Sequence, residues 1–156
     1  MDIRKPELNA HEDDWKEYAK AGCELIKSKL ALFLTKRLGG KRKRQEIALN
    51  TGGGRIVRAL GANYDLYLRL FPRTETGWPR ETIVIAGVRF DEQRKGHGTE
   101  LLKLLIKLAP VVGYQHIGIE TTNHRSAPFA ERCGLQFTGR GSDYIGSVAD
   151  IQQALR

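Results

Sequence analysis

Apolar residues recur every three or four positions through the first quarter of the chain. Between about residues 10 and 38 they are Trp15, Tyr18, Ala19, Gly22, Leu25, Ile26, Leu30, Phe33 and Leu34. This period places them on one helical face, and Gly39 and Gly40 supply an end signal, so the pattern predicts a long amphipathic helix. Asn9 and Glu12 resemble a capping box at its start, and Gly22 is a point at which the helix could break.

Two shorter runs have the alternating pattern of strands. Residues 55–60 and 64–70 are predicted to pair around the turn 61–63, and the alternation in the second run indicates one solvent-facing side. The glycine-rich segment 51–54 is predicted to be a hairpin turn or a linker.

A third run, 83–90, is too apolar for a surface strand and is predicted to be buried. It leads into Gln93-Arg94-Lys95-Gly96-His97-Gly98, and a leucine-rich helix follows over 99–108 and is expected to stop at Pro110. A strand, a turn with two glycines and a helix N-terminus direct free N–H groups and the positive helix end to one point. Arg94, Lys95 and His97 add positive charge, so the segment predicts a pyrophosphate cradle, although glycine-rich turns of this kind also occur for steric reasons alone.

The spacing of the glycines excludes two other phosphate loops. A Walker loop needs four residues between its glycines followed by Gly-Lys-Ser/Thr, and a dinucleotide fingerprint needs a third glycine where Leu101 stands. A second motif follows: a predicted strand at 116–120, Asn123, Ser126, a short helix, Gly134 and an apolar strand start at Phe137.

The turn fits the pattern Gln/Arg-x-x-Gly-x-Gly/Ala, and with the Asn123-to-Gly134 motif it resembles the GNAT superfamily of N-acetyltransferases over residues 83–137. The resemblance implies an α/β fold with a GNAT-like mixed sheet flanked by helices, an acetyl-CoA-binding core at about 82–138, and acetyl transfer to a primary amine. It implies that acetyl-CoA contacts Val88, Phe90, Gln93, Arg94, Lys95, Gly96, His97, Gly98, Thr99, Asn123 and Ser126.

Acid–base chemistry has one candidate base and no clear acid. Glu120 ends a strand where the sheet should splay, and a half-buried carboxylate there would have a raised pKa; a surface glutamate is the equally plain alternative. Many GNAT enzymes place a tyrosine four residues before the motif glycine, where this chain has Ala130. Tyr144 and Cys133 are candidate substitutes on sequence proximity alone.

The length of 156 residues suits one domain, 1–156, with a core of its own. The only cysteines, Cys23 and Cys133, lack metal or disulfide spacing, so no metal site is expected. Neither a signal sequence nor a membrane-spanning run is found, which favours a cytoplasmic protein without membrane contact.

The net charge of +8 is uneven, with a basic block at Lys36-Arg37 and Lys41-Arg42-Lys43-Arg44. This block could bind nucleic acid or an acidic partner, or it could be a solvated helix end and loop. The acceptor amine is not identified by the sequence: a small molecule, a protein and an aminoacyl-tRNA all remain open.

Two departures from the family pattern concern the ends of the chain. No convincing strand precedes the long helix and no clear final strand ends the chain, so we expect reduced terminal strands or a sheet completed by a second copy in a homodimer. With Ala130, these departures favour the alternative function, a non-catalytic GNAT-like module that binds CoA, nucleic acid or protein.

Overall fold

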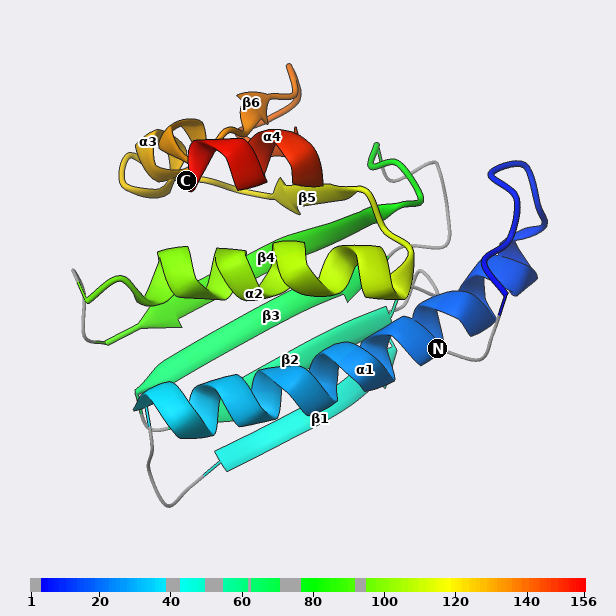
Figure 1. The fold of residues 1–156 in the computed structure, drawn as a ribbon, viewed down its shortest axis with the longest axis horizontal. Helices are drawn as coiled ribbons and strands as arrows, with labels where there is room; N and C mark the ends of the chain where they lie inside the picture. The colour runs from blue at the N-terminus through cyan, green and yellow to red at the C-terminus, as the bar shows by residue number, and fades with distance from the viewer. Residues whose placement is uncertain (1–3, 39–42, 50–54, 62, 71–76, 92–94) are drawn as a thin grey trace.

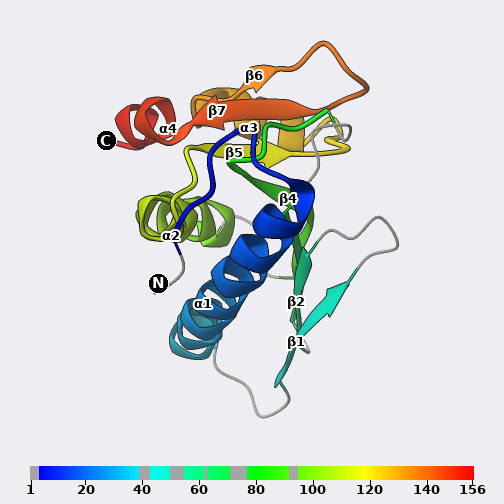
Figure 2. The same ribbon diagram turned by 90° about the vertical axis from the view of Figure 1, so that its right-hand side faces the viewer.

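The computed structural model describes residues 4–38, 43–49, 55–61, 63–70, 77–91 and 95–156, and only the backbone of 43–49, 55 and 56. Within this part of the chain, helices α1 and α2 lie on the same face of a twisted mixed sheet (Figures 1 and 2). The strand order is β1-β2-β3-β4-β5-β7-β6. The expected mixed α/β sheet flanked by helices is therefore confirmed.

Four of the seven strands form an antiparallel meander, and β5 then pairs parallel to β4. Strand β7 pairs antiparallel with β5 and β6. The elements are α1 Glu12–Leu38, β1 Lys43–Leu49, β2 Arg55–Gly61, β3 Tyr64–Leu70, β4 Thr82–Phe90, α2 His97–Val112, β5 His116–Ile119, α3 Ser126–Arg132, β6 Gln136–Phe137, β7 Tyr144–Ser147 and α4 Val148–Ala154.

The long amphipathic helix is confirmed as α1, unbroken over 27 residues. Its buried face follows the predicted spacing, and Gly22 lies on that face, where an added Cβ would be 3.2 Å from Leu70 Cδ2. The predicted start is two residues early: His11 accepts the N–H of Asp13 at Nδ1, 3.1 Å, whereas Asn9 lies in the preceding turn.

One hydrophobic core joins the four helices to the sheet. In β3 the odd and even positions separate as predicted: Leu66, Leu68 and Leu70 are buried, whereas Asp65 and Arg69 are half-buried on the other face. That other face carries a small cluster in which Trp78 packs on Val84. The sheet therefore has one face covered by α1 and α2 and one open face.

The sheet splays between β4 and β5. Their parallel pairing runs from Thr82 opposite His116 to Ile85 opposite Ile119, and the Glu120 N–H still donates to the Ile85 carbonyl at 3.1 Å. Beyond this point β4 continues to Phe90 while β5 has ended. The predicted burial of 83–90 therefore holds for the first half of β4 only, and Val88 in the second half is 44% exposed.

A β-bulge lies at the start of the splay. Tyr67 pairs with Gly87 and Leu68 pairs with Ile85, so Ala86 is an extra residue in β4. As a result Val88 and Phe90 face the helices, as Ile83 and Ile85 do.

The prediction that Pro110 stops the second helix is wrong. Helix α2 continues to Val112 and ends at Gly113, which has φ +78° and donates its N–H to the Pro110 carbonyl. Pro110 lacks only an N–H and so removes one hydrogen bond near the end of the helix, whereas Gly113 supplies the left-handed residue that closes it.

One of the two expectations about the chain ends is confirmed: among the described residues no strand precedes α1, and β1, which follows α1, forms that edge of the sheet. The other requires correction, because a final strand exists. Strand β7 is four residues long and contains Gly146, where an added Cβ would be 3.0 Å from the Gly134 carbonyl oxygen. The last helix, α4, is capped by Ser147, whose Oγ accepts the N–H of Asp150 at 3.0 Å.

Candidate functional site

A cleft of about 510 Å³ lies where α2 begins, between the second half of β4 and α3. Eight of the predicted cofactor-binding residues line it: Val88, Phe90, Gly96, His97, Gly98, Thr99, Asn123 and Ser126. Of the other three, Lys95 is exposed and does not line the cleft, and Gln93 and Arg94 lie outside the described residues. Two motifs that are distant in sequence thus line the same cleft.

The floor of the cleft is the N-terminus of α2. Gly96 has φ +76°, which favours glycine, and no side chain caps the helix. The first N–H to bond back is that of Glu100, to the Gly96 carbonyl at 3.0 Å, so the three preceding N–H groups have no helical acceptor. Unpaired donors at the positive end of a helix fit a phosphate group.

Side chains at the rim strengthen this fit. Three arginines, Arg89, Arg125 and Arg132, line the cleft, and none of the described residues in its lining is acidic. Arg89 also forms an ion pair with Asp91 at 2.7 Å. A Cβ added to Gly98 would be 3.5 Å from Phe129 Cζ. The space between the turn and α3 at this point therefore admits a methyl group and nothing larger.

Asn123 and Ser126 line the cleft and also form the hydrogen bonds at the start of α3. Asn123 Oδ1 accepts the N–H groups of Arg125 and Ser126, at 2.8 and 3.0 Å, and Ser126 Oγ accepts the Asn123 N–H at 2.9 Å. These reciprocal bonds start α3. The spacing of Asn123 and Ser126 therefore has a local cause beside the predicted cofactor contact.

The sequence analysis missed Arg89, Arg125, Phe129 and Arg132 in the lining. A signal for three of them was present, because positions 125, 129 and 132 are separated by four and three residues and share one side of a helix. Nothing in the sequence distinguished Arg89 from other surface arginines.

Glu120 lies on the open face of the sheet. Its carboxylate forms an ion pair with Arg69 at 3.0 Å and accepts a hydrogen bond from Trp78, whose ring covers Gly118. Burial raises the pKa of Glu120 above its ordinary value; Arg69 lowers that pKa, Asp143 raises it, and the bond from Trp78 lowers it. The net direction is upward, as the sequence analysis expected for a half-buried carboxylate.

The residue after Glu120 is strained. Thr121 has φ +54°, the one non-glycine residue with positive φ in the described part of the chain. The Asp143 carboxylate accepts the Thr121 N–H at 2.9 Å, and Thr122 bonds the Ser142 carbonyl through its N–H and its hydroxyl. The loop before β7 thus holds the end of β5 in place.

The two candidate acids lie outside the cleft lining. The Tyr144 hydroxyl donates to Glu131 at 3.0 Å, and this bond raises the pKa of Tyr144. Cys133 is buried in the core, and burial raises the pKa of its thiol. Ala130 is fully buried, whereas its neighbour Phe129 is half-buried and lines the cleft.

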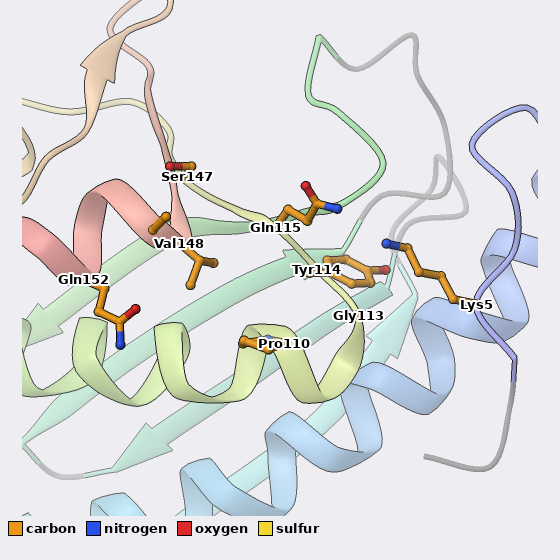
Figure 3. A pocket seen from close by; sticks show the side chains of 9 residues that line it. Lys5, Pro110, Gly113, Tyr114, Gln115, Ser147, Val148 and Gln152 are labelled. Atoms are coloured by element: carbon orange, nitrogen blue, oxygen red, sulfur yellow. The ribbon is translucent and has the colours of Figure 1, made fainter.

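A second hollow, of about 460 Å³, lies at the opposite end of α2 (Figure 3). Helix α2 has 16 residues and is therefore about 24 Å long, so this hollow is remote from the cleft. Its lining includes Lys5, Tyr114 and Gln152 and none of the predicted site residues.

Among the described residues, no helix is long and apolar enough to cross a membrane. The same residues contain no group of three His, Cys, Asp or Glu side chains that could hold a metal ion.

Comparison with known proteins gives one family. Residues 64–135 match the sequence model of the acetyltransferase (GNAT) family, and no curated protein matches the chain. Among solved structures, a protein from Agrobacterium tumefaciens assigned as an acetyltransferase is 16% identical, with 94% of this chain and 99% of that chain covered and a TM-score of 0.45.

Two more solved structures are similar at the same level. YncA from Salmonella typhimurium, solved with acetyl-CoA, is 16% identical, with 89% of this chain and 91% of that chain covered and a TM-score of 0.44. AtaT, solved with acetyl-methionyl-tRNAfMet, is 12% identical, with 83% and 87% covered and a TM-score of 0.43. The segment that matches the acetyltransferase (GNAT) family contains the whole of β4, the glycine turn and the Asn123-to-Gly134 motif, and these are the residues on which the resemblance to the family rests.

Proposed function

We propose that this protein is an N-acetyltransferase that transfers an acetyl group from acetyl-CoA to a primary amine. The observation that carries the proposal is the splay of β4 from β5, because the cleft is lined by the unpaired second half of β4, and Glu120 ends β5 at the point where the two strands separate. Acetyl-CoA, as a substrate, would supply the acetyl group as a thioester.

Different groups of the protein would bind different parts of acetyl-CoA. The unpaired N–H groups at the start of α2, with Arg125 and Arg132, would hold the phosphates. The second half of β4 has no pairing with β5, so its main-chain groups on that side are available to an extended, amide-bearing arm. Val88 and Phe90 would form the apolar side of that channel.

Glu120 would take the proton that the amine loses as its nitrogen attacks the thioester carbonyl. The raised pKa suits a base that works near neutral pH, and the ion pair with Arg69 keeps the carboxylate oriented. The new bond is N–C and the broken bond is C–S, and the thiolate leaves without a protein acid in the described cleft. Direct transfer needs no covalent bond to the protein.

Calorimetry with acetyl-CoA tests the binding half of this proposal. Gly98→Val should weaken binding by more than about tenfold, because a branched side chain would fill the gap beside Phe129. Gly98→Ala is the matched control: its Cβ at 3.5 Å makes an ordinary contact, so its affinity should stay within about threefold of wild type. Thermal unfolding of both variants should match the wild type to within a few degrees.

Release of free CoA thiol tests the transfer half, with amines, peptides and aminoacyl-tRNA as acceptors. Absence of acetyl-CoA binding at millimolar concentration would contradict the proposal. Binding without transfer to any acceptor class would instead support the non-catalytic CoA-binding module.

A further inference from the structure

Arg37, in the last turn of α1, reaches the turn that starts α2. The two helices run antiparallel, so the end of α1 lies beside the beginning of α2 (Figure 1). Arg37 Nε donates to His97 Nδ1 at 2.8 Å, and Arg37 Nη2 donates to the Lys95 carbonyl at 2.9 Å. A Cβ added to Gly96 would be 3.7 Å from the same Nη2 atom. One guanidinium therefore meets three successive residues of the turn.

His97 is an unusual choice for its place. The side chain is only 8% exposed, and its ring packs 5.2 Å from that of Phe90. A guanidinium can only donate, so Nδ1 is the acceptor and the proton of the neutral ring is on Nε2. Nε2 is buried and has no partner among the described residues.

An apolar side chain would fill this position without a buried, unpaired N–H, which costs free energy. What the imidazole adds is the Nδ1 acceptor for Arg37. The burial of His97 is thus explained by the bond it forms across the helix pair.

The turn 95–98 contains two glycines, so its conformation has to be fixed by contacts from outside the turn. Gly96 and Gly98 have wide conformational freedom, yet the three free N–H groups bind one anion only if their peptide planes are held. The bond to the Lys95 carbonyl fixes the peptide plane that leads into Gly96, and the bond to His97 fixes the first residue of α2.

We propose that Arg37 is a positioning residue that holds the turn 95–97 in its phosphate-binding conformation through the fork of its guanidinium. The inference rests on the proposed function for the identity of the ligand, acetyl-CoA. The planar fork is the property that matters, because lysine supplies the same charge without two donors in a fixed geometry.

Three single variants separate the fork from its charge. Arg37→Lys keeps the charge and loses the fork, Arg37→Gln loses both, and Lys36→Gln removes one charge next to Arg37, at a side chain for which the structure describes no bond to the turn. Acetyl-CoA affinity, from calorimetry, should fall about tenfold in both Arg37 variants and less than about twofold in Lys36→Gln. Acetyl-pantetheine, which lacks the pyrophosphate, should bind all four proteins equally.

Hydrogen exchange over residues 95–100 and the 15N signals of His97 give a readout without ligand. Both Arg37 variants should exchange faster over this segment than wild type and Lys36→Gln, and the His97 signals should lose the pattern of a proton fixed on Nε2. Wild-type affinity in Arg37→Lys would overturn the inference in favour of a purely electrostatic role. Unchanged exchange in both Arg37 variants would also overturn it, even if the wild-type protein failed to bind acetyl-CoA and the proposed function were lost.

Discussion

The environment of Glu120 predicts how activity depends on pH. Only the carboxylate form can accept a proton, and burial raises its pKa, so the transfer rate should rise with pH through that raised pKa. Glu120→Gln should lower the rate by about 10²-fold and leave acetyl-CoA affinity unchanged. Initial rates of thiol release over a range of pH, together with calorimetry, would check both statements.

Asp143→Asn isolates one electrostatic contribution to this pKa. Asparagine keeps an oxygen acceptor for the Thr121 N–H but removes the negative charge that raises the pKa of Glu120. The rising limb of the profile should therefore move to lower pH. A limb that stayed in place, or moved upward, would show that Glu120 is not the group that titrates.

Many GNAT enzymes have a tyrosine at the position of Ala130, and the structure shows where a tyrosine could be introduced into this protein. Ala130 is fully buried, so Ala130→Tyr would overpack the core at a cost of about 1–3 kcal/mol of unfolding free energy. Phe129→Tyr is the better placed variant, because Phe129 lines the cleft. It should keep acetyl-CoA affinity within about twofold and add an acid whose titration bends the pH profile near a pKa of about 10. Urea denaturation of the two variants provides the comparison, and a less stable Phe129→Tyr than Ala130→Tyr would refute this placement.

At the residue scale, the glycine turn, Asn123 and Ser126 could be predicted because they belong to motifs with fixed spacing. Glu120 could be predicted because it ends a strand where the sheet splays. The contact of Arg37 with the turn could not be predicted from the sequence, because a basic residue in the last turn of a helix is already explained by the helix dipole. Its contact with His97 depends on how two helices pack, which spacing along the chain does not specify.

Among the elements, α2 depends on its terminal glycine. Gly113 has φ +78°, and a Cβ there would be 2.2 Å from the Tyr18 hydroxyl, so Gly113→Ala combines backbone strain with a displaced tyrosine. We expect a loss of about 1–3 kcal/mol in urea denaturation. Val111→Ala, in the same turn of helix and 55% exposed, is the control and should change stability by less than about 0.5 kcal/mol. Equal midpoints for the two variants would contradict this account of the helix end.

Long elements were predictable and short ones were not. The periodic face of α1 and the alternation of β3 extend over enough positions to define a period. Strand β7 has four residues and one of them is Gly146, which is too little sequence for a pattern. Strand β1 begins with Lys43 and Arg44, and the sequence pattern around these two residues predicts a basic block instead of an edge strand.

For the whole molecule, the net charge of +8 predicts salt-dependent ligand binding. Acetyl-CoA affinity should fall several-fold between about 50 and 300 mM salt, because added ions screen the arginines at the cleft. Acetyl-pantetheine, which has no phosphate, should show little change in the same titration. Parallel salt responses of the two ligands would mean that the arginines do not face the phosphates.

Lys41 and Arg42 of the basic block lie outside the described residues, and nucleic-acid binding by this block stays a prediction.

The extra residue Ala86 divides β4 into two halves of opposite parity. Before it, odd-numbered residues face the helices; after it, even-numbered residues do. In a regular strand with the same residues, Val88 and Phe90 would face away from the cleft, so the sides of these two residues depend on Ala86 being unpaired. Removing Ala86 would remove the bulge and the extra residue together. Gly87 would still pair with Tyr67 and Ile85 with Leu68, and Val88 and Phe90 would keep their side. Inserting one alanine after Gly87 would instead shift the second half of the strand by one residue and turn Val88 and Phe90 out of the cleft. Calorimetry should therefore find acetyl-CoA binding largely retained in the deletion and abolished in the insertion.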